Sequence, residues 1–428
     1  MSGQTLQAPR GTADLLGDRA KALAEVRELC AQILGQAGYE PIETPAFEAT
    51  ELFARGVGEA TDIVQKEMYT FTDGSGRSLT LRPEGTAAVC RAYIEHGMHR
   101  RPAPVRLWYF GPFFRYERAQ AGRYRQFWQV GVEAFGSPDP ALDAELIVLL
   151  VRIARALGVE RTELRLSSLG KPESRDRYRQ ALQAFLRSRE DELAAEVRAR
   201  IDQNPLRAFD SKDPGTQAVM AEAPLLLDFL DEEDLAHLEA VRELLGEAGI
   251  DHRLDPRLVR GLDYYTQTVF ELVCPDLGAQ SGVGGGGRYD RLVAQLGGPP
   301  TPAGGFAAGI ERLLLAAGRF DGRFLDPAPD LYLLYTTTPA SRDQRRRAFG
   351  ILASLWEAGL AAQLEVTGRS LRRGLAQAAK VGARLAVLVG EEDRVALKDL
   401  GSGEQWTVPA DRLVAVAKER LGGNGHPA

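Results

Sequence analysis

Residues 114–129 read FRYERAQAGRYRQFWQ and interleave four arginines with five aromatic rings. The segment AQAG, residues 119–122, separates two strand-like runs, so the stretch predicts a β-hairpin. A hairpin brings the arginines of its two strands together, and like charges repel unless an anion lies between them. The guanidinium fork suits phosphate because it offers paired planar donors. A solvated hairpin face with ordinary salt bridges is the alternative, and this stretch alone does not decide between the two.

Composition narrows the class of protein. The chain has 428 residues, 44 % hydrophobic and 26 % charged, which is enough for two or three packed domains. A net charge of −6 argues against a protein that coats nucleic acid nonspecifically. The three cysteines form no CxxC pair and the five histidines lack ligand spacing, so we expect no disulfide framework and assign no metal ligand. Without a signal peptide or an apolar run of membrane length, we expect a cytoplasmic protein.

The rest of the chain divides into regions of different pattern. Strand-like and helical segments alternate up to residue 320, and residues 68–83 predict a second hairpin around the turn DGSG. This mixture predicts an α+β fold, an antiparallel sheet with flanking helices. Residues rich in Arg, Glu, Leu and Ala predict a helical insertion, and a final alternation of strands and helices predicts a compact α/β domain. The expected boundaries are a core of 1–170 and 251–320, an insertion of 171–250 and a C-terminal domain of 330–428.

Three further segments carry residues suited to chemistry. LTLRPEGT (79–86) places Glu84 and Thr86 at a strand end, and LVRGLDYYTQTVFE (258–271) holds Arg260 among apolar and aromatic residues. GGFAAGIERL (304–313) is a glycine-rich strand that runs into a helix carrying Arg312. With the hairpin arginines, these segments favour a site for an anionic substrate. The glycine-rich SGVGGGGRYD (281–290) has neither the Walker ending nor the Rossmann pattern, so its glycines are expected to allow close backbone approach.

Together these segments closely resemble the histidyl-tRNA synthetases, a branch of the class II aminoacyl-tRNA synthetases. YEPIETPAFE (39–48) is similar to motif 1 of that class, FRYERAQAGRYRQFWQVGVEAFG (114–136) to motif 2 and GFAAGIERL (305–313) to motif 3. LVRGLDYY (258–265) and GGGGRYD (284–290) resemble the two signatures of the histidine branch. The resemblance runs from PRGTADLL (9–16) into the C-terminal domain, and five motifs in the same order make it specific.

The resemblance implies an architecture and a reaction. The architecture is the class II antiparallel sheet with flanking helices, a helical insertion and a C-terminal α/β anticodon-binding domain. The reaction joins histidine to ATP, with Mg²⁺ neutralising phosphate charge, and then passes histidine from histidyl-adenylate to the 3′-terminal adenosine of its cognate tRNA. Motif 1 in this family builds a homodimer, and no membrane is involved.

The resemblance also implies roles for the polar residues of these motifs. Arg115 would hold the α-phosphate of ATP, Arg312 the outer phosphates, and Arg260 the α-phosphate together with the histidine carboxylate. The remaining positions form a list: Glu84, Thr86 and Gln129 would surround the α-amino group, Glu133 and Tyr265 would grip the imidazole, and Gln120 would approach the tRNA acceptor end. In the C-terminal domain, Arg369, Arg372 and Arg373 would contact the anticodon region or form a solvated helix face.

Two alternatives compete with this interpretation. The regulatory subunit of ATP-phosphoribosyltransferase shares the core fold without the activity, but such relatives typically lack the C-terminal domain that residues 330–428 predict here. A synthetase for threonine or proline carries a similar anticodon domain, but RGLDYY (260–265) and the missing zinc-ligand spacing speak against it. Tyr116 and Trp128 depart from motif 2, where histidine is frequent, and neither has been given a ligand role.

Overall fold

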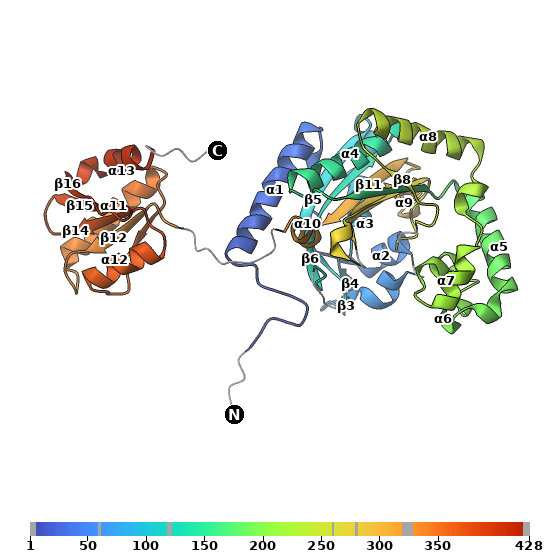
Figure 1. The fold of residues 1–428 in the computed structure, drawn as a ribbon, viewed down its shortest axis with the longest axis horizontal. Coiled ribbons are helices and arrows are strands. Elements are labelled where there is room, and N and C mark those ends of the chain that lie inside the picture. Colours follow the sequence, from blue (N-terminus) through green and yellow to red (C-terminus); the bar gives the residue numbers. More distant parts are fainter. Residues whose placement is uncertain are drawn as a thin grey trace, which may run out of the picture. The chain divides into compact units, whose positions relative to one another are not determined.

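The computed structural model of the chain describes residues 6–58, 61–117, 122–258, 261–278, 281–318 and 328–422. It divides into two compact units, Met1–Gly322 and Arg323–Ala428 (Figure 1). Within the described residues, no helix is long and apolar enough to cross a membrane.

The first unit is built on one large sheet. Its described strands run in the order β1-β5-β6-β11-β10-β9-β7-β8, and neighbours are antiparallel except that β1 pairs parallel with β5 and β8 with β7. The strands are β1 (Glu40–Pro41), β5 (Val105–Phe114), β6 (Gln126–Phe135), β7 (Glu163–Ser168), β8 (Arg253–Leu254), β9 (Thr268–Val273), β10 (Gly282–Arg288) and β11 (Ala303–Gly309). The unit combines this largely antiparallel sheet with helices between its strands, so the predicted α+β fold class is confirmed.

Helices cover the sheet on both faces. They are α1 (Asp18–Gln36), α2 (Thr50–Val57), η1 (Ile63–Glu67), α3 (Thr86–Glu95), η2 (Met98–Arg100), α4 (Pro140–Ala156), α9 (Leu292–Gln295) and α10 (Ile310–Ala316), with η6 (Pro275–Leu277) between strands. On one face α4 packs against the sheet with α1 and α8 (Glu232–Glu247) beside it (Figure 1). That packing buries Leu146 and Leu150 of α4 with Phe270 and Phe306 of the strands. The opposite face is left for α2, α3 and α9 and for the cavity described below.

The stretch 114–129 forms the predicted hairpin. β5 and β6 pair antiparallel from Val105↔Phe135 to Phe114↔Gln126, so the turn falls on the segment between Phe114 and Gln126. Successive side chains of a strand point to opposite faces. Val130 and Val132 therefore lie in the core beneath α4, whereas Gln129 and Glu133 share the other face.

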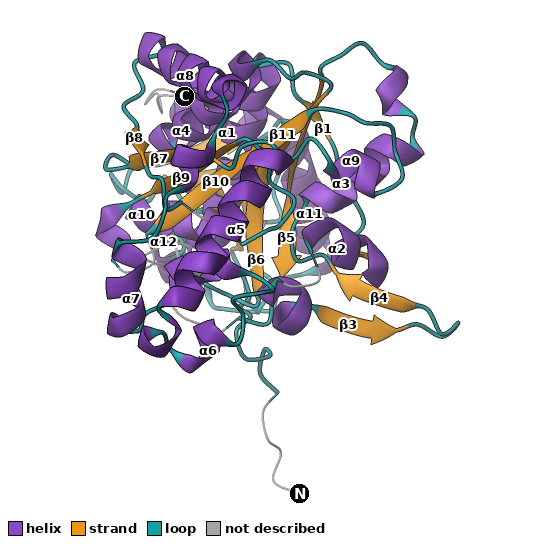
Figure 2. Ribbon diagram, turned by 90° about the vertical axis from the view of Figure 1, so that its right-hand side faces the viewer, coloured by secondary structure: helices purple, strands orange, loops and turns teal. Residues whose placement is uncertain are grey.

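A smaller sheet stands out from the body of the first unit (Figure 2). It has the order β2-β4-β3, with β2 (Phe47–Ala49), β3 (Tyr69–Thr72) and β4 (Ser78–Leu81). β3 and β4 pair antiparallel around the turn, as residues 68–83 predict. At its exposed side the rings of Phe47 and Phe71 meet edge to face with centroids 6.1 Å apart.

The segment predicted as a helical insertion holds helices of different lengths joined by turns. They are α5 (Pro172–Ser188), η3 (Glu190–Glu192), α6 (Ala195–Arg198), η4 (Pro205–Asp210), α7 (Pro214–Ala221) and η5 (Leu226–Phe229). Tyr178 and Leu182 of α5 pack with Val197 and Val219 in the same core that holds Tyr265. The next helix, α8, differs because Leu238, Val241 and Leu245 pack on α4 instead.

The second unit is a separate α/β layer structure. Its described strands run in the order β13-β12-β14-β15-β16, with β12 parallel to β13 and β14 and the remaining pairs antiparallel. The elements are β12 (Leu331–Tyr335), α11 (Arg342–Glu357), β13 (Ala362–Leu364), α12 (Leu371–Lys380), β14 (Leu385–Val389), β15 (Arg394–Asp399), β16 (Gln405–Pro409), η7 (Ala410–Arg412) and α13 (Leu413–Gly422). Ser341 and Gln344 form a capping box at the start of α11, which satisfies two otherwise unpaired backbone donors.

Arg288, at the end of β10, ties the sheet to α4 from inside the protein. Its side chain is 1 % exposed, its Nε lies 2.8 Å from Asp143 Oδ1, and its terminal nitrogens donate to the carbonyl oxygens of Ser137 and Asp139. Asp143 Oδ2 lies 2.7 Å from His237 Nε2 on α8. Three elements therefore meet at one buried ion pair.

We expect the substitution Arg288→Ala to lower the free energy of unfolding by about 3–5 kcal/mol, because it leaves a buried carboxylate without its cation. Urea unfolding followed by circular dichroism would measure this loss. Arg253→Ala, which removes a solvent-exposed partner of Glu163, is the control and should change stability little. A loss at Arg288 no larger than the control's would contradict the structural role of the pair.

Candidate active site

A cavity of about 650 Å³ lies over the face of the sheet opposite α4. Its walls come from the start of α3, the hairpin β5–β6, the loop before β9, strands β10 and β11, and the start of α10. Six of the nine residues that the sequence predicts for the site line it: Glu84, Thr86, Arg115, Gln129, Tyr265 and Arg312. Residues far apart in the sequence are therefore brought to one place.

Glycines make room for the aromatic floor of this cavity. Tyr109 on β5 stands opposite Gly131 on β6, and a Cβ built on Gly131 would lie 2.0 Å from the Tyr109 ring. A Cβ on Gly85 would lie 2.3 Å from the same ring. No side chain larger than hydrogen fits at either position without moving Tyr109.

Glu133 lies one layer beneath the cavity and does not belong to its lining. Its side chain is fully buried, and it accepts hydrogen bonds from Thr86 Oγ1 (2.8 Å), Tyr109 Oη (3.3 Å) and Tyr289 Oη. Burial raises the pKa of the Glu133 carboxyl to about 8, and the three hydroxyl donors only partly oppose this. At neutral pH this carboxyl is therefore largely protonated.

Glu84 and Thr86 sit where β4 leads into α3. Glu84 accepts hydrogen bonds from the backbone N–H groups of Thr86 (2.7 Å) and Ala87 (2.9 Å), so its carboxylate caps the first turn of the helix. Burial nevertheless raises the pKa of Glu84. The Thr86 hydroxyl is already committed to Glu133. Both side chains are thus held rigidly before any substrate arrives.

The hairpin arginines do not all face the cavity. Arg115 donates from Nε to the carbonyl oxygen of Pro83 (2.8 Å), and Arg123 donates to Glu117 (3.0 Å), whose carboxylate also lies 3.9 Å from Arg115. Both arginines line the cavity. Arg125 does not, because its guanidinium stacks 3.9 Å from the centroid of the Tyr116 ring. The expectation that arginines of both strands converge therefore holds for Arg115 and Arg123 and is wrong for Arg125.

Arg312 enters the cavity from the first turns of α10. It donates from Nε to the carbonyl oxygen of Gly282 on β10. Burial lowers the pKa of Arg312, and the neighbouring charge of Arg123 lowers it further. A bound anion between these two arginines would relieve that repulsion.

Glu311, next to Arg312, holds motif 3 against motif 2. Both carboxyl oxygens accept from the backbone N–H of Trp128 at 3.0 Å. Burial raises the pKa of Glu311 to about 7, although this backbone donor opposes the rise. The residue preceding Gln129 is thereby tied to the helix that carries Arg312.

Gln129 offers an unused acceptor. Among the described residues, its Oε1 is one of the buried polar atoms without a hydrogen-bond partner, and the side chain lines the cavity. An unpaired buried acceptor costs free energy unless a ligand supplies the donor. This atom therefore suits a cationic N–H donor on a substrate.

The structure leaves some predictions untested and adds residues that sequence reasoning missed. Arg260 and Gln120 lie outside the described residues. Around the cavity and Glu133, the additions are Tyr109, Glu117, Lys212, Tyr264, Glu271 and Tyr289. Tyr264, Tyr289 and Glu117 lie inside the recognised motifs, so their place there was an available signal. Lys212 lies in the segment 171–250 and no local pattern marks it. No group of three or more His, Cys, Asp or Glu that could hold a metal occurs within the described residues.

We expect the buried Glu133 to make stability fall as pH rises from about 4.5 to about 8. In that window the folded protein keeps a proton that the unfolded chain has released, whereas below it both states hold the proton and nothing is lost. Glu133→Gln cannot ionise. The melting temperature of the unaltered protein should therefore drop between pH 5.5 and 8.5 by at least about 2 °C more than that of the variant. If the melting temperatures of the two proteins fell equally over this pH range, the prediction would be wrong, because Glu133 would then ionise normally in the folded protein.

Comparison with known families identifies the arrangement. A family model described as Histidyl-tRNA synthetase matches residues 11–313, and one described as Anticodon binding domain matches residues 336–420. The chain belongs to the histidyl-tRNA synthetase family. A curated histidine–tRNA ligase of Thermosynechococcus vestitus is 48 % identical over 414 residues, with 96 % of each chain covered. The predicted membership is confirmed.

Solved structures agree with this family. The apo histidyl-tRNA synthetase of S. aureus is 35 % identical with a TM-score of 0.79, covering 97 % of this chain and 100 % of that one. A Bacillus halodurans protein described as an ATP phosphoribosyltransferase regulatory subunit/histidyl-tRNA synthetase reaches a TM-score of 0.65 at 22 % identity, covering 91 % and 99 %. The second likeness shows the shared fold alone, so it does not favour the regulatory alternative.

Proposed function

We propose that the cavity over β5, β6, β10 and β11 is where this member of the histidyl-tRNA synthetase family activates histidine. The protein is an aminoacyl-tRNA ligase. In its first step a carboxylate oxygen of histidine attacks the α-phosphorus of ATP, forming histidyl-adenylate and releasing pyrophosphate. In the second, the 3′-terminal ribose hydroxyl of the tRNA attacks the histidyl carbonyl and AMP leaves. The observation that carries the assignment of the site is the convergence of six predicted residues in one cavity.

The cationic side of the cavity is assigned to the triphosphate. Arg115 is oriented by its bond to Pro83 and by its position 5.4 Å from the Phe127 ring, so it can meet the α-phosphate without reorganising. Arg312 and Arg123 would take the outer phosphates. Glu117 bridges Arg115 and Arg123, and phosphate oxygens would take over its role as anion. Arg260 is assigned to the α-phosphate and the substrate carboxylate by resemblance alone.

The opposite side is assigned to histidine. Gln129 Oε1 would accept from the α-ammonium group, next to Glu84 and Thr86. Tyr265 would line the imidazole pocket. Glu133 would contact the imidazole ring from beneath the cavity. Direct contact requires that one of the hydroxyl groups now bonded to Glu133 move away. A wrong amino acid would leave these buried polar groups unpaired, and that is costly enough to provide selectivity.

Mg²⁺ belongs to the same proposal. This cation is usually held by phosphate oxygens and waters with only one or two carboxylates, so it needs no protein cluster of its own. Glu271, on β9 in the cavity wall, would supply such a carboxylate. When bound, the ion would neutralise charge on the phosphates, and the orientation of ATP would rest on the arginines.

The second unit and the hairpin turn are assigned to tRNA. Arg372 and Arg373 are exposed in the first turn of α12 and can reach the anticodon region, whereas Arg369 is partly engaged because it donates to Glu365 (3.0 Å). Gln120 would approach the acceptor end. Since aminoacylated tRNA is consumed at the ribosome, we place the protein in the cytoplasm.

A homodimer completes the proposal. Phe47 of the motif 1 segment is 49 % exposed and its neighbour Phe71 is 43 % exposed. Paired aromatic rings on a projecting sheet are costly to leave in water and suit a protein interface. Light scattering on the purified protein should give twice the mass of one chain.

Pyrophosphate exchange with each of the twenty amino acids tests the function. Radiolabelled pyrophosphate should enter ATP with histidine and at least about a hundredfold more slowly with any other amino acid, because the polar pocket penalises unpaired groups. Exchange driven best by another amino acid would refute the assignment of the pocket. Exchange with none would refute the assignment of an adenylation site.

A further inference from the structure

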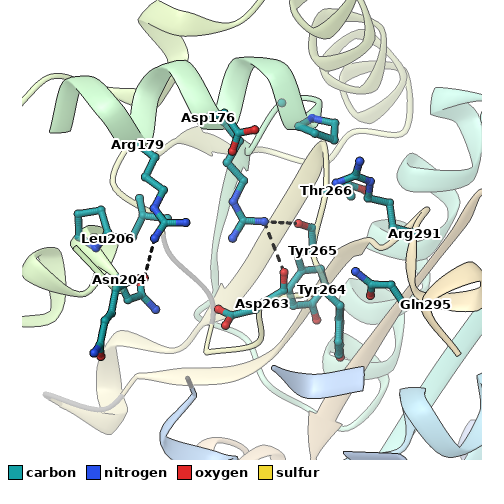
Figure 3. Close-up of a pocket in the computed structure, with 15 residues that line it drawn as sticks. Asp176, Arg179, Asn204, Leu206, Asp263, Tyr264, Tyr265, Thr266, Arg291 and Gln295 are labelled. Atoms are coloured by element: carbon teal, nitrogen blue, oxygen red, sulfur yellow. Dashed lines mark hydrogen bonds between the residues drawn. The ribbon is translucent and has the colours of Figure 1, made fainter. Parts of the chain in front are cut away.

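A second cavity, of about 300 Å³, lies behind the loop of residues 261–266 (Figure 3). One wall comes from α5 and η4 of the segment 171–250, and the other from Asp263, Tyr264, Tyr265 and Thr266. Tyr264 and Tyr265 line both this cavity and the larger one assigned to the substrates. The loop is therefore a thin partition, and whatever holds its rear face sets the position of its front face.

Arg175 of α5 holds the rear face. From Nη1 it donates to the carbonyl oxygen of Tyr265 (3.1 Å) and to that of Asp263 (3.4 Å), the two bonds drawn as dashed lines ending at these residues in Figure 3. Its side chain lines the second cavity and is absent from the lining of the first. Burial lowers the pKa of Arg175, and the charge of Asp263 opposes the change. The protein thus places a desolvated guanidinium against two backbone oxygens of one loop.

The other anchors of the loop hold its backbone on different sides. Asp263 N–H donates to the carbonyl oxygen of Val57 at the end of α2 (3.1 Å), and Thr266 N–H donates to that of Arg288 on β10 (2.8 Å). Between these two points lie the tyrosines. Arg175 spans this interval from Asp263 to Tyr265, so its loss would remove one support from the part of the loop that carries both rings.

We propose that Arg175 is a positioning residue for histidine recognition, through which α5 of the segment 171–250 fixes Tyr264 and Tyr265 in the wall of the substrate cavity. This inference rests on the proposed placement of histidine in that cavity. Preorganisation of this kind acts on the affinity for the substrate that touches the loop, because a loosened loop must be ordered again on binding. The affinity for ATP should change much less, because ATP is assigned to the arginines of the hairpin and α10.

Arg179 provides a matched control one helical turn away. It lines the same cavity, and its guanidinium also donates to two backbone carbonyls, those of Asp202 (2.8 Å) and Gln203 (3.0 Å), which belong to the segment 171–250 itself. Arg175→Ala and Arg179→Ala therefore remove the same chemistry from the same helix. They differ in whether the loop of residues 261–266 loses its support, and also in burial, because Arg179 is exposed whereas Arg175 is partly buried.

Steady-state pyrophosphate exchange on the full-length variants would measure KM for histidine and for ATP. Arg175→Ala should raise KM for histidine about tenfold, the size expected for losing hydrogen bonds from a charged donor, while KM for ATP stays within about twofold. Arg175→Lys keeps the charge and a single donor nitrogen and should recover part of the loss. Arg179→Ala should leave both constants near their original values.

Unchanged KM for histidine in Arg175→Ala would overturn the inference, as would an equal rise in both constants or the same rise in Arg179→Ala. Tyr265→Ala separates this from failure of the site assignment. If Tyr265→Ala raises KM for histidine and Arg175→Ala does not, the role of Arg175 alone is refuted. If neither does, both are refuted. Should Arg175→Ala fail to fold by circular dichroism, the same two constants for Arg175→Lys decide: a selective rise for histidine supports the role, and no rise refutes it.

Discussion

Arg115→Ala should reduce the kcat of histidine-dependent pyrophosphate exchange about a hundredfold to a thousandfold. The guanidinium is held in place by Pro83 and Phe127 before substrate binds, so it can stabilise charge that grows at the α-phosphorus during attack. An interaction made mainly in the transition state lowers kcat more than it raises KM for ATP. Steady-state exchange assays would separate the two constants.

Arg125→Ala is the matched control for that substitution. Arg125 belongs to the same hairpin but stacks on Tyr116 outside the cavity, so its loss should change kcat less than about fivefold. Near-normal exchange by a folded Arg115→Ala protein would remove this arginine from the mechanism. Equal losses in both variants would point to damage of the hairpin as a whole.

A chain shortened to end at residue 325 should keep histidine-dependent pyrophosphate exchange and lose tRNA aminoacylation by at least about a hundredfold. Every residue assigned to activation lies in the first unit, whereas the anticodon-binding match covers residues 336–420 in the second. Backbone contacts from basic residues dominate affinity for nucleic acid, so their removal raises KM for tRNA most. Both assays can be run on the same preparation.

The shortened chain must first be compared with the full chain by light scattering, because the proposed dimer could depend on both units. Given equal oligomeric states, equal losses of exchange and aminoacylation would defeat the proposed division of labour. Arg372→Ala with Arg373→Ala in the full chain offers a milder version, which should raise KM for tRNA and leave exchange unchanged.

Local sequence patterns were sufficient for the class of fold and for much of the site. Alternation along residues 126–135 places Gln129 and Glu133 on one face of β6 because the side-chain period of a strand is two. The order of the motifs predicted the family, and the α/β pattern after residue 330 predicted a separate unit. These features depend on neighbours along the chain, and neighbours are what a sequence displays.

Only the tertiary structure decided which of these residues meet and in what state. Glu133 is buried by Thr86, Tyr109 and Tyr289, which stand 47, 24 and 156 positions away, and this burial raises its pKa to about 8. The strand order β5-β6-β11-β10 brings residues distant in sequence around Glu133. A periodic pattern predicts which face of a strand a side chain lies on, but it does not predict which strand pairs with it. The support of Tyr265 by Arg175, 90 positions earlier, has the same origin. Desolvation and long-range hydrogen bonding depend on the packed whole, so they could not be predicted from local patterns.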